Sequence, residues 1–597
     1  MKYEINNHSV CYSGAITDFV LSNLEQTLLL RYGKPEKLFS SKEGLLIEFT
    51  EVNLDEPESS CLWQNGCRFK NKNVVWSFFT ADRIRSILWR INGLRKIVLH
   101  FKVPLLRTFK VPFVDPVEIQ QPLSVSHSQD SITFSNIFCM KVIKGRLAAI
   151  KKRENRSIEV TIESDDLQQI EISFRSTQGK DERSEEFENQ LYVERLLENC
   201  PKNLNDLERS LYLFSAHTAL SCWKDFKVAQ CLSAGNNYSF PRRTYFRDGF
   251  WTSLTLLKIQ PKIVRDQILA LSQGVHEDGC PSAVMFLDDE EKLLLRQFVR
   301  KNEAIKQFVR YENDWWSDHH DSGPLFILLV SEYIRLSGDI TVLLERANEG
   351  TVLEKVNSVV LQMKRYQRNE DGLILKPFDS KDWADNVFRN GLVTYDLALQ
   401  IAALREAYKL FKLSGENRED LFEDYQRMKN SFNKRLFNPT NGYFCDFIGT
   451  YVEDHLSLDT VVAILYEISD REKALSTLLK MEELLESRNN EYQPYGDWGV
   501  MSVWPLYKKR SHLFGKSAFA YRYHNGSCWP YLSSAYALAR FKNGLDPSYG
   551  LLKWWEYSLE KGWINLVEYY SPAYQRGGLN QAWSSFAAYV IKEMHDQ

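Results

Sequence analysis

Hydrophobic and polar residues alternate with two different periods in the two parts of the chain. Before about residue 190, short apolar runs repeat at every second position and are separated by polar turns. This period, in segments rich in β-branched residues, is typical of strands. The clearest runs are 44–49, 96–103, 131–134, 157–163 and 169–174. Many short strands predict a β-sandwich, which one helical stretch near 79–94 is expected to interrupt.

From about residue 191 the period becomes 3.6 residues, which is typical of amphipathic helices. Twelve segments have this period: 204–224, 248–258, 261–275, 323–337, 351–367, 392–413, 418–436, 457–467, 470–486, 529–543, 549–561 and 579–594. Twelve helices joined by alternating short and long loops fit six helical hairpins closed into a ring, an (α/α)6 toroid. The expected domains are a β-sandwich-like domain at 1–190, ending in a charged linker near 176–190, and an all-α toroid at 191–597.

Composition and charge exclude several classes of protein. The chain has 597 residues, 26% of them charged, and a net charge of −3 with mixed signs, which argues against a nucleic-acid partner. The N-terminus has no apolar stretch of the signal-peptide kind, and no run approaches ~18 apolar residues, so no membrane partner is expected. The 10 cysteines are scattered without any Cys-x-x-Cys pair. They predict free thiols, no structural zinc and a cytoplasmic location.

Three segments place acidic or polar groups beside tryptophan or tyrosine, each before an apolar helical pattern. They are 381–389, 523–530 and 567–584, in a chain that is 13% aromatic. A carboxyl group that gives or takes a proton, beside flat rings that cover the apolar face of a sugar, is typical of a sugar-cleaving site. Since the segments are far apart in sequence, we expect one pocket assembled from several loops. The aromatic-rich loop 487–526 is of the kind that carries such sites.

The carboxylates in these segments each have a functional and a purely structural interpretation. An Asp beside Trp383 in a partly dry pocket would have a raised pKa and could act as a general acid. Alternatively, Asp382 or Asp385 caps the following helix or its preceding turn. Glu568 lies in a polar loop before the last helix, where it could activate a water molecule or pair with Arg576.

Two earlier segments have a similar composition. Segment 242–251 places Arg247 and Asp248 at a helix start, and 313–323 gathers Asp, His and Trp residues. The second cluster lacks the i, i+4 histidine spacing of a helical zinc motif. We therefore expect no metal and no cofactor. In the structural interpretation this cluster is a loop in which Asp321 caps a helix.

Residues 235–595 resemble the (α/α)6-barrel glycoside hydrolases. This group includes the amylo-α-1,6-glucosidase domain of glycogen-debranching enzymes, the family 63 α-glucosidases and mannosylglycerate hydrolases, and the family 37 trehalases. Segment 383–389, Trp-Ala-Asp-Asn-Val-Phe-Arg, resembles both the debranching Trp-Met-Asp segment and the family 63 Trp-Asp-Asn-Ser-x-Arg. Segment 523–530 resembles the debranching Tyr-His-x-Gly-x-x-Trp-Pro, and 581–584 its Gln-Ala-Trp-Ser. Glu568-Tyr-Tyr resembles the family 63 Glu-x-Tyr.

The resemblance implies an inverting, exo-acting glycoside hydrolase, most simply an α-glucosidase. Asp385 aligns with the general acid and Glu568 with the general base. The implied substrate-binding residues are Tyr245, Arg247, Asp248, Trp315, Asp321, Trp383, Arg389, Trp498, His524, Asn525 and Trp529. The chain departs from debranching enzymes after the acid motif, where Tyr395 or Asp396 replaces a Glu, and the trehalase signatures are absent.

Three other functions stay open at this point. A glycoside phosphorylase on the same fold would use phosphate instead of water and would need no base, so Glu568 argues against it. A sucrose-cleaving relative is suggested by Asp321-Ser-Gly. A non-catalytic glycan-binding protein would use the aromatic loops for recognition alone. In each case the expected partner is a carbohydrate, and the sequence does not predict an oligomeric state.

Overall fold

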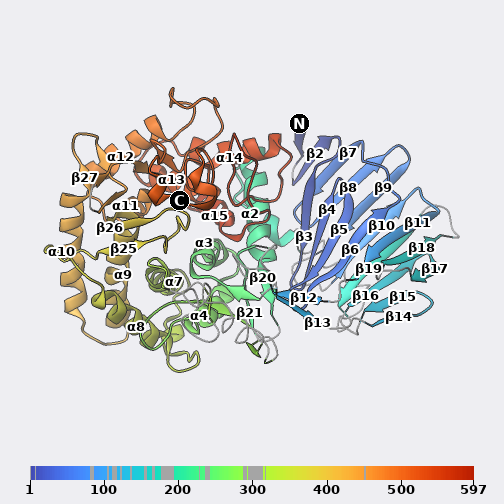
Figure 1. Cartoon of the computed structure of the whole chain (residues 1–597), viewed down its shortest axis with the longest axis horizontal. Coiled ribbons are helices and arrows are strands. Elements are labelled where there is room, and N and C mark those ends of the chain that lie inside the picture. Colours follow the sequence, from blue (N-terminus) through green and yellow to red (C-terminus); the bar gives the residue numbers. More distant parts are fainter. Residues whose placement is uncertain are drawn as a thin grey trace.

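The computed structural model places two antiparallel sheets at one end of the molecule and a ring of helices at the other (Figure 1). It describes residues 2–6, 8–80, 86–103, 106–109, 117–120, 124–134, 138–152, 157–164, 169–176, 192, 194–226, 229–235, 242–286, 289, 292–293, 314–315, 318–449 and 452–596. The predicted linker near 176–190 and the predicted boundary at residue 190 lie outside these residues, apart from Ser176. The division into two domains there stays a prediction.

The N-terminal strands form two sheets in which every pair is antiparallel. The ten-stranded sheet has the order β1 (Tyr3–Asn6), β2 (Ser9–Ser13), β7 (Ser59–Trp63), β8 (Gly66–Asn71), β9 (Val74–Phe79), β10 (Ser86–Asn92), β19 (Gln169–Ser176), β16 (Phe138–Lys144), β15 (Ser131–Phe134) and β14 (Val125–His127). The seven-stranded sheet has the order β17 (Arg146–Lys152), β18 (Ser157–Glu163), β11 (Lys96–Lys102), β6 (Gly44–Val52), β5 (Lys34–Ser40), β4 (Gln26–Arg31) and β3 (Asp18–Ser22). A separate hairpin joins β12 (Leu106–Phe109) to β13 (Val117–Gln120).

Aromatic side chains join the two sheets face to face. Phe49 of β6 meets Phe174 of β19 edge-on at 6.0 Å, and Phe101 of β11 meets Phe134 of β15 at 6.0 Å. All four rings are buried, as expected where the inner faces of two sheets form one core. The predicted β-sandwich is confirmed, and all five predicted runs are strands.

The helix predicted near 79–94 is wrong. Ser86–Asn92 is strand β10, which pairs with β9 on one side and with β19 on the other. Its residues Ser86 to Trp89 are all buried. A central strand buried on both faces loses the period-two alternation, and a short apolar run without that alternation is easily mistaken for part of a helix.

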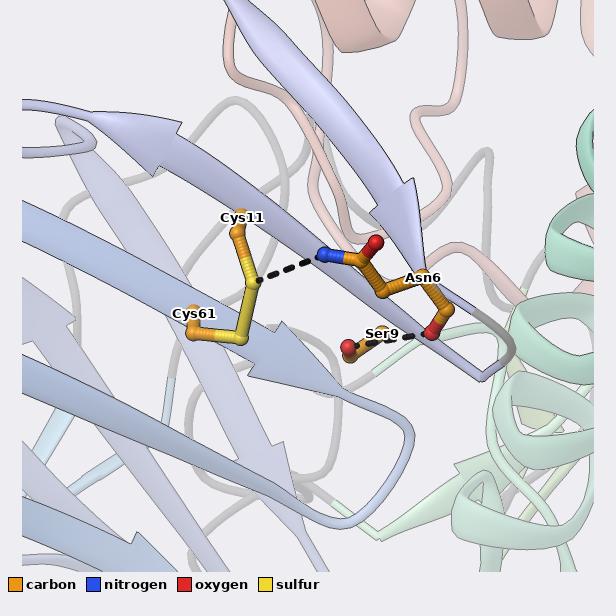
Figure 2. The surroundings of a disulfide bond; sticks show 4 residues. All are labelled: Asn6, Ser9, Cys11 and Cys61. Carbon is orange, nitrogen blue, oxygen red and sulfur yellow. Dashed lines mark hydrogen bonds between the residues drawn. A yellow bond between two sulfur atoms is a disulfide. The ribbon is translucent and has the colours of Figure 1, made fainter.

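The expectation that all cysteines are free thiols is wrong for one pair. Cys11 in β2 and Cys61 in β7 are direct cross-strand partners, with their Cα atoms 4.0 Å apart, and they form a disulfide. Figure 2 shows the bond between the two strands, with the Asn6 side chain donating to Cys11 Sγ. The two cysteines are 50 residues apart, and nothing in the local sequence pairs them. The register of β2 and β7 brings them opposite each other. The other eight cysteines are free.

Twelve helices whose bounds the structure gives follow the sheets, close to the twelve predicted segments. They are α2 (Asp206–Ser221), α3 (Phe246–Leu257), α4 (Pro261–Ser272), α7 (Ser322–Ser337), α8 (Val352–Arg365), α9 (Thr394–Leu413), α10 (Glu419–Arg435), α11 (Val461–Leu465), α12 (Arg471–Leu484), α13 (Pro530–Lys542), α14 (Ser548–Glu560) and α15 (Phe586–His595). Short 3₁₀ segments are η4 (Ile340–Leu344), η5 (Leu458–Thr460), η6 (Arg510–His512), η7 (Gly515–Ala518) and η8 (Ala582–Ser585). Short strands lie in the connections: β20 (Trp223–Asp225), β21 (Gln230–Leu232), β22 (Arg243–Thr244), β23 (Ala283–Met285), β24 (Asp314–Trp315), β25 (Lys376–Asp379), β26 (Arg389–Val393), β27 (Phe437–Asn438), β28 (Tyr443–Phe444), β29 (Phe447–Ile448), β30 (Val452–Glu453), β31 (Leu456–Ser457) and β32 (Val503–Trp504).

Helix contacts close the ring. Helices α3, α7, α9, α11, α13 and α15 each touch the next in this order, and α15 returns to α3. The remaining helices lie outside this inner ring, so the (α/α)6 toroid is confirmed. None of the described helices combines the length and the apolar character needed to cross a membrane.

Long connections gather at one end of the ring. Each inner helix follows a long connection, and the connections after α3, α7, α9, α11 and α13 are shorter, so the long connections meet where the inner helices begin. They are 222–245, 273–321, 366–393, 436–457, 485–529 and 561–581. A pocket at this end is therefore assembled from segments distant in sequence, as expected from the aromatic and acidic motifs.

Candidate active site

A cavity of about 170 Å³ lies at this end of the ring. Five of the six long connections, together with the first turns of α3 and α7 and the 3₁₀ segment η8, supply its lining. The lining residues are Ala234, Arg243, Tyr245, Phe246, Arg247, Asp248, Ala283, His319, Ser322, Asp385, Tyr523, Glu568, Gln581 and Trp583. Both predicted catalytic carboxylates, Asp385 and Glu568, are among them, along with three predicted substrate-binding residues, Tyr245, Arg247 and Asp248.

Asp385 lies in the connection before α9, with its side chain 22% exposed. Burial raises the pKa of this carboxyl to about 7, and the charges of Glu568 and Asp382 add to the rise. Arg247 and a hydrogen bond from Tyr523 oppose it. His524 Nδ1 lies 3.8 Å from Asp385 Oδ1, but burial lowers the pKa of His524 well below its ordinary value. A neutral imidazole supplies no counter-charge, so Asp385 holds a proton near neutral pH.

Glu568 lies in the connection before α15 and is 8% exposed. Its Oε2 accepts a hydrogen bond from the Gly578 amide at 3.1 Å. Burial raises the pKa of the carboxyl, while this hydrogen bond and the charge of Lys516 lower it. Gly577 lets the backbone approach, because a Cβ there would lie 2.5 Å from Glu568 Oε2 and 2.6 Å from the Tyr569 ring.

The N-terminal sheet holds the loop that carries Glu568. The Asn565 side chain accepts from Val20 N at 2.8 Å and donates to Val20 O at 3.0 Å, which pairs it with edge strand β3. On the other side of Glu568, Arg576 forms an ion pair with Asp18 of the same strand at 2.6 Å. Of the two alternatives that the sequence left open for Glu568, the pairing with Arg576 is therefore not formed, because Arg576 pairs with the sheet instead. The edge strand fixes the loop at both ends and leaves the Glu568 carboxylate facing the cavity.

Arg247 is held by a buried carboxylate behind it. Arg247 Nε and Nη2 donate to the two oxygens of Asp321 at 2.6 and 3.1 Å, and Tyr395 donates to Asp321 at 3.2 Å. Arg247 Nη2 also lies 3.1 Å from His319 Nδ1. The structure therefore places Asp321 behind the cavity wall, where it orients Arg247, and not in the lining. A two-pronged pair of this kind fixes a guanidinium in one plane.

Asp248 lies beside Arg247 in the first turn of α3. Gln581 Nε2 donates to Asp248 Oδ1 at 3.1 Å. Burial raises the pKa of Asp248 to about 6; the Arg247 charge opposes the rise and the Glu568 charge adds to it. Arg247, Asp248 and Gln581 thus present hydrogen-bond donors and acceptors on one wall of the cavity.

Three of the predicted sugar-binding rings form the buried floor beneath the cavity and are absent from its lining. Trp529 is stacked on His524 with ring centroids 4.9 Å apart, and Trp383 meets both rings edge-on. All three side chains are at most 2% exposed. The Trp383 indole donates to Asp459, and the Trp529 indole donates to Tyr523 O at 3.1 Å. In this arrangement the rings position Asp385 and Tyr523.

Arg389, predicted to bind substrate, is the fully buried centre of an ion network. It lies 2.8 Å from Asp382, 3.0 Å from Asp446 and 2.7 Å from Asp459. Asp382 also binds Lys376 and accepts from Ala384 N at 2.8 Å. This network anchors both ends of the segment that carries Asp385.

We predict that Arg389→Met destabilises the protein strongly, because three buried carboxylates lose their shared partner. The expected loss of unfolding free energy is about 3–5 kcal/mol. Chemical denaturation measures it. Arg335→Met is the matched control: among the described residues Arg335 forms an ion pair only with Glu332, three residues away, and its side chain is 54% exposed. The control is expected to lose at most about 1 kcal/mol. Equal losses in the two variants would contradict the anchoring role.

Two further predicted residues, Trp498 and Asn525, are absent from the cavity lining. Trp498 is buried and donates to Gln493 at 3.2 Å. Asn525 accepts from Tyr507 N at 2.9 Å and donates to Ser517 O at 3.1 Å, so it holds the loop before α13 in shape. The side chain of Trp315 lies outside the described residues.

Nine lining residues were not predicted as site residues: Ala234, Arg243, Phe246, Ala283, His319, Ser322, Tyr523, Gln581 and Trp583. Tyr523, Gln581 and Trp583 belong to the segments that resemble debranching enzymes, so the motifs contained the signal. Arg243 had none. It is 6% exposed, its guanidinium lies 5.4 Å from the Tyr245 ring, and within the described residues it makes no ion pair or side-chain hydrogen bond. The described residues also hold no group of three or more His, Cys, Asp or Glu side chains arranged for a metal ion.

Comparisons with known proteins agree with this arrangement. Residues 319–591 match the family model of amylo-alpha-1,6-glucosidase. The resemblance expected from the sequence motifs is thus confirmed over this stretch, which contains Asp385 and Glu568. The match supports glycoside hydrolase activity. A search of the curated proteins finds no match.

Two solved structures are similar over nearly their whole length. A bacterial glucoamylase in complex with acarbose is 11% identical with a TM-score of 0.57, and the match covers 100% of this chain and 97% of that one. A rhamnosidase from Klebsiella oxytoca with rhamnose bound is 12% identical with a TM-score of 0.48, covering 97% and 96%. At this identity the glucoamylase likeness bears on the fold alone, and it extends through both the sandwich and the toroid.

Proposed function

We propose that this protein is an inverting, exo-acting α-glucosidase. Asp385 protonates the glycosidic oxygen, and Glu568 deprotonates a water molecule that attacks the opposite face of the sugar. The observation that carries the proposal is that one small cavity holds both carboxylates in different electrostatic settings. Arg247, Asp248 and Gln581 beside them bind the hydroxyls of the terminal glucose.

The surroundings of the two carboxyl groups suit Asp385 as the acid and Glu568 as the base at the same pH. Asp385 faces a neutral His524 and the charges of two other carboxylates, which favour its protonated form. Glu568 accepts a backbone N–H and lies near Lys516, which both favour its ionised form. Pairs of titratable groups whose environments separate their pKa values in this way are typical of acid–base catalysis.

The small size of the cavity supports cleavage of a single sugar from the end of the substrate. Its volume of about 170 Å³ lies below the ~300–1,000 Å³ of sites that enclose drug-sized ligands. It suits one terminal sugar, with the rest of the substrate outside. We place Tyr523 and Trp583 against the ring of that sugar, in the role first expected of Trp383 and Trp529.

Phosphorolysis is the second candidate, and Arg243 favours it. A buried guanidinium that forms no ion pair among the described residues is suited to an anion such as phosphate. In that reaction phosphate would replace the water, and the product would be a sugar phosphate. Glu568 argues for hydrolysis, because a phosphorylase needs no base.

Proton NMR of the products tests the proposal. The substrates are kojibiose, nigerose, maltose, isomaltose, trehalose, sucrose, glucosylglycerate and a short branched dextrin, each with and without phosphate. The expected result is early β-glucose from an α-linked donor without phosphate. Early α-glucose would contradict inversion, and a sugar phosphate formed only with phosphate would replace hydrolysis by phosphorolysis. If the folded protein binds these sugars but does not cleave them, the alternative of a non-catalytic glycan-binding protein would be favoured.

We predict a bell-shaped pH dependence of kcat/KM. Asp385 must be protonated to act as an acid, so the rate is expected to fall as the pH rises through about 7. Glu568 must be ionised to act as a base, so the rate falls at low pH, at a pKa above the ordinary value for glutamate. Initial rates from about pH 4 to about pH 9 measure both limbs. A substrate whose leaving group needs no proton should lack the alkaline limb; an alkaline limb that persists there would contradict the assignment to Asp385.

A further inference from the structure

Two buried polar atoms face each other beside the cavity without forming a hydrogen bond. His524 Nδ1 lies 3.8 Å from Asp385 Oδ1, beyond the ~2.7–3.2 Å of such a bond. Both atoms are buried, and neither has another hydrogen-bond partner in the described part of the chain; the same holds for His524 Nε2. Leaving a buried polar atom unpaired costs stability, so this pair needs an explanation.

The His524 ring is held in place without the use of its nitrogens. It is stacked on Trp529 with an interplanar angle of 9°, and Trp383 meets it edge-on at 4.9 Å. The backbone N–H of His524 donates to Ser517 Oγ at 3.3 Å, and its carbonyl accepts from Ser502 Oγ at 3.1 Å. Packing and the backbone therefore fix where Nδ1 lies, and the nitrogen itself is left for a partner that is not yet engaged.

The protonation of the two groups decides what they can exchange. Burial lowers the pKa of His524 well below its ordinary value, so the ring is neutral and carries one N–H. While Asp385 is protonated, it has no charge to attract this N–H. Once Asp385 has given up its proton, a movement of about 1 Å brings Nδ1–H within hydrogen-bond distance of the carboxylate. Hydrogen bonds of catalytic groups are often long before the substrate binds and shorten as the reaction proceeds.

We propose that His524 is a positioning residue for the acid, and that its Nδ1–H donates to Asp385 Oδ1 as this carboxyl passes its proton to the leaving group. One proton moves, from Asp385 to the departing oxygen, and His524 keeps its own proton throughout. Because the hydrogen bond forms only as the carboxylate develops, it stabilises the transition state more than the bound substrate. The inference rests on the proposed function, and it gives His524 a role other than the sugar binding expected from the motifs.

The sign of the pH effect follows from this hydrogen bond. A donor to the ionised carboxyl favours that form, so losing it raises the pKa of Asp385. Since Asp385 acts in its protonated form, the alkaline limb of kcat/KM then moves to higher pH, although turnover is slower. The other charged or titratable groups around the pair stay unchanged in the test variants. They are Tyr245, Arg247, Asp382, Arg389, Lys516, Tyr523 and Glu568.

The test replaces His524 by Phe, which keeps a stacked ring and removes both nitrogens. On an α-glucoside with an unactivated leaving group, kcat is expected to fall about 10- to 100-fold with little change in KM, and the alkaline limb to rise by about one to two pH units. On α-glucosyl fluoride, which needs no full protonation, most of the loss should disappear. His524→Asn should recover most of the rate, because its amide lies near the place of Nδ1. His524→Gln places its amide near Nε2 and should not.

Stability separates this role from a structural one. His524→Phe removes two buried nitrogens that have no hydrogen-bond partner among the described residues, so it should unfold at the wild-type denaturant concentration or at a higher one. His217→Phe is the matched control: His217 is also buried, but its Nδ1 lies 2.7 Å from the Tyr192 hydroxyl. This control should unfold at a lower denaturant concentration and keep the wild-type kcat and pH profile.

Three kinetic results overturn the inference: an unchanged kcat and alkaline limb in His524→Phe, an equal loss on the fluoride without a shift of that limb, or equal rates for His524→Asn and His524→Gln. The last comparison decides the matter even if the Phe variant does not fold. If the wild type cleaves no glucoside, the proposed function fails, and an infrared titration decides the inference separately. The C=O band that Asp385→Asn removes is expected to persist to higher pH in His524→Phe, and an unchanged midpoint would overturn the inference.

Discussion

Asp385→Asn lowers kcat by about 10²- to 10⁴-fold on a glucoside with an unactivated leaving group, which is the contribution expected of a general acid. The amide cannot donate a proton to the departing oxygen, while its size and its place beside His524 are retained. KM should change little, because Arg247, Asp248 and Gln581 are untouched. Steady-state rates on the substrate identified by NMR measure both parameters.

The matched control for this variant is the leaving group. On α-glucosyl fluoride, whose departing ion needs no full protonation, Asp385→Asn should recover most of the wild-type rate. A loss of the same size on both substrates would contradict the acid role and would point to a disturbed cavity. Near-normal turnover of the unactivated substrate would exclude Asp385 from the chemistry.

The stability of Asp385→Asn separates lost chemistry from a lost fold. The pKa of Asp385 is raised to about 7 in the folded protein, so the folded state keeps a proton that the unfolded chain has already released. The unfolding free energy therefore falls as the pH rises from the ordinary pKa of aspartate to about 7. The amide has no such penalty. At pH 8 we expect the variant to unfold at the same denaturant concentration as the wild type or at a higher one.

The elements of both domains could be predicted from the sequence because their periods differ. The inner helices retain the 3.6-residue pattern, and the sandwich strands retain the alternation. Strand β10 could not be predicted, because a strand buried on both faces has no alternation. The Cys11–Cys61 disulfide could not be predicted either, since it depends on a strand register that local spacing does not encode.

The candidate site could be predicted at the level of segments but not of side chains. The 381–389 segment contains Asp382 and Asp385, three residues apart, and sequence alone leaves capping open for each. In the structure Asp382 is fully buried against Arg389, while Asp385 lines the cavity. Likewise the motifs led to Trp383 and Trp529, although the rings that line the cavity are Tyr245, Phe246, Tyr523 and Trp583. Burial decides these roles, and burial depends on the whole ring of loops.

The loop that carries Glu568 is held by the N-terminal sheet. It is tied to strand β3 through Asn565 and Arg576 on either side. Among the described residues the sandwich supplies none of the cavity lining. It holds the loop of Glu568, the proposed base, while the Arg389 network holds the segment of Asp385, the proposed acid, from the helical side. Catalysis by two carboxylates depends on the distance between them. The contacts with β3 and the Arg389 network together fix the distance between Glu568 and Asp385.

Glu568→Ala is therefore expected to lower hydrolysis of an α-glucoside by about 10²- to 10⁴-fold, because water is no longer deprotonated as it attacks. The variant also opens space beside Gly578, where the carboxylate accepted a backbone hydrogen bond. Azide is already an anion and needs no base. It is expected to enter this space and restore sugar transfer, with β-glucosyl azide as the product.

The configuration of the azide product makes this test specific to the position of Glu568. Attack from the space that the carboxylate leaves is attack on the face opposite the departing group, so the azide must be β if Glu568 lies there. An α-linked azide would place the open space on the leaving-group side and contradict the assignment. Asp385→Asn serves as the control, since azide cannot replace a proton donor and should not restore turnover of an unactivated glucoside. Rescue confined to Glu568→Ala would assign the two carboxylates to opposite faces of the same sugar, which is the arrangement that inversion requires.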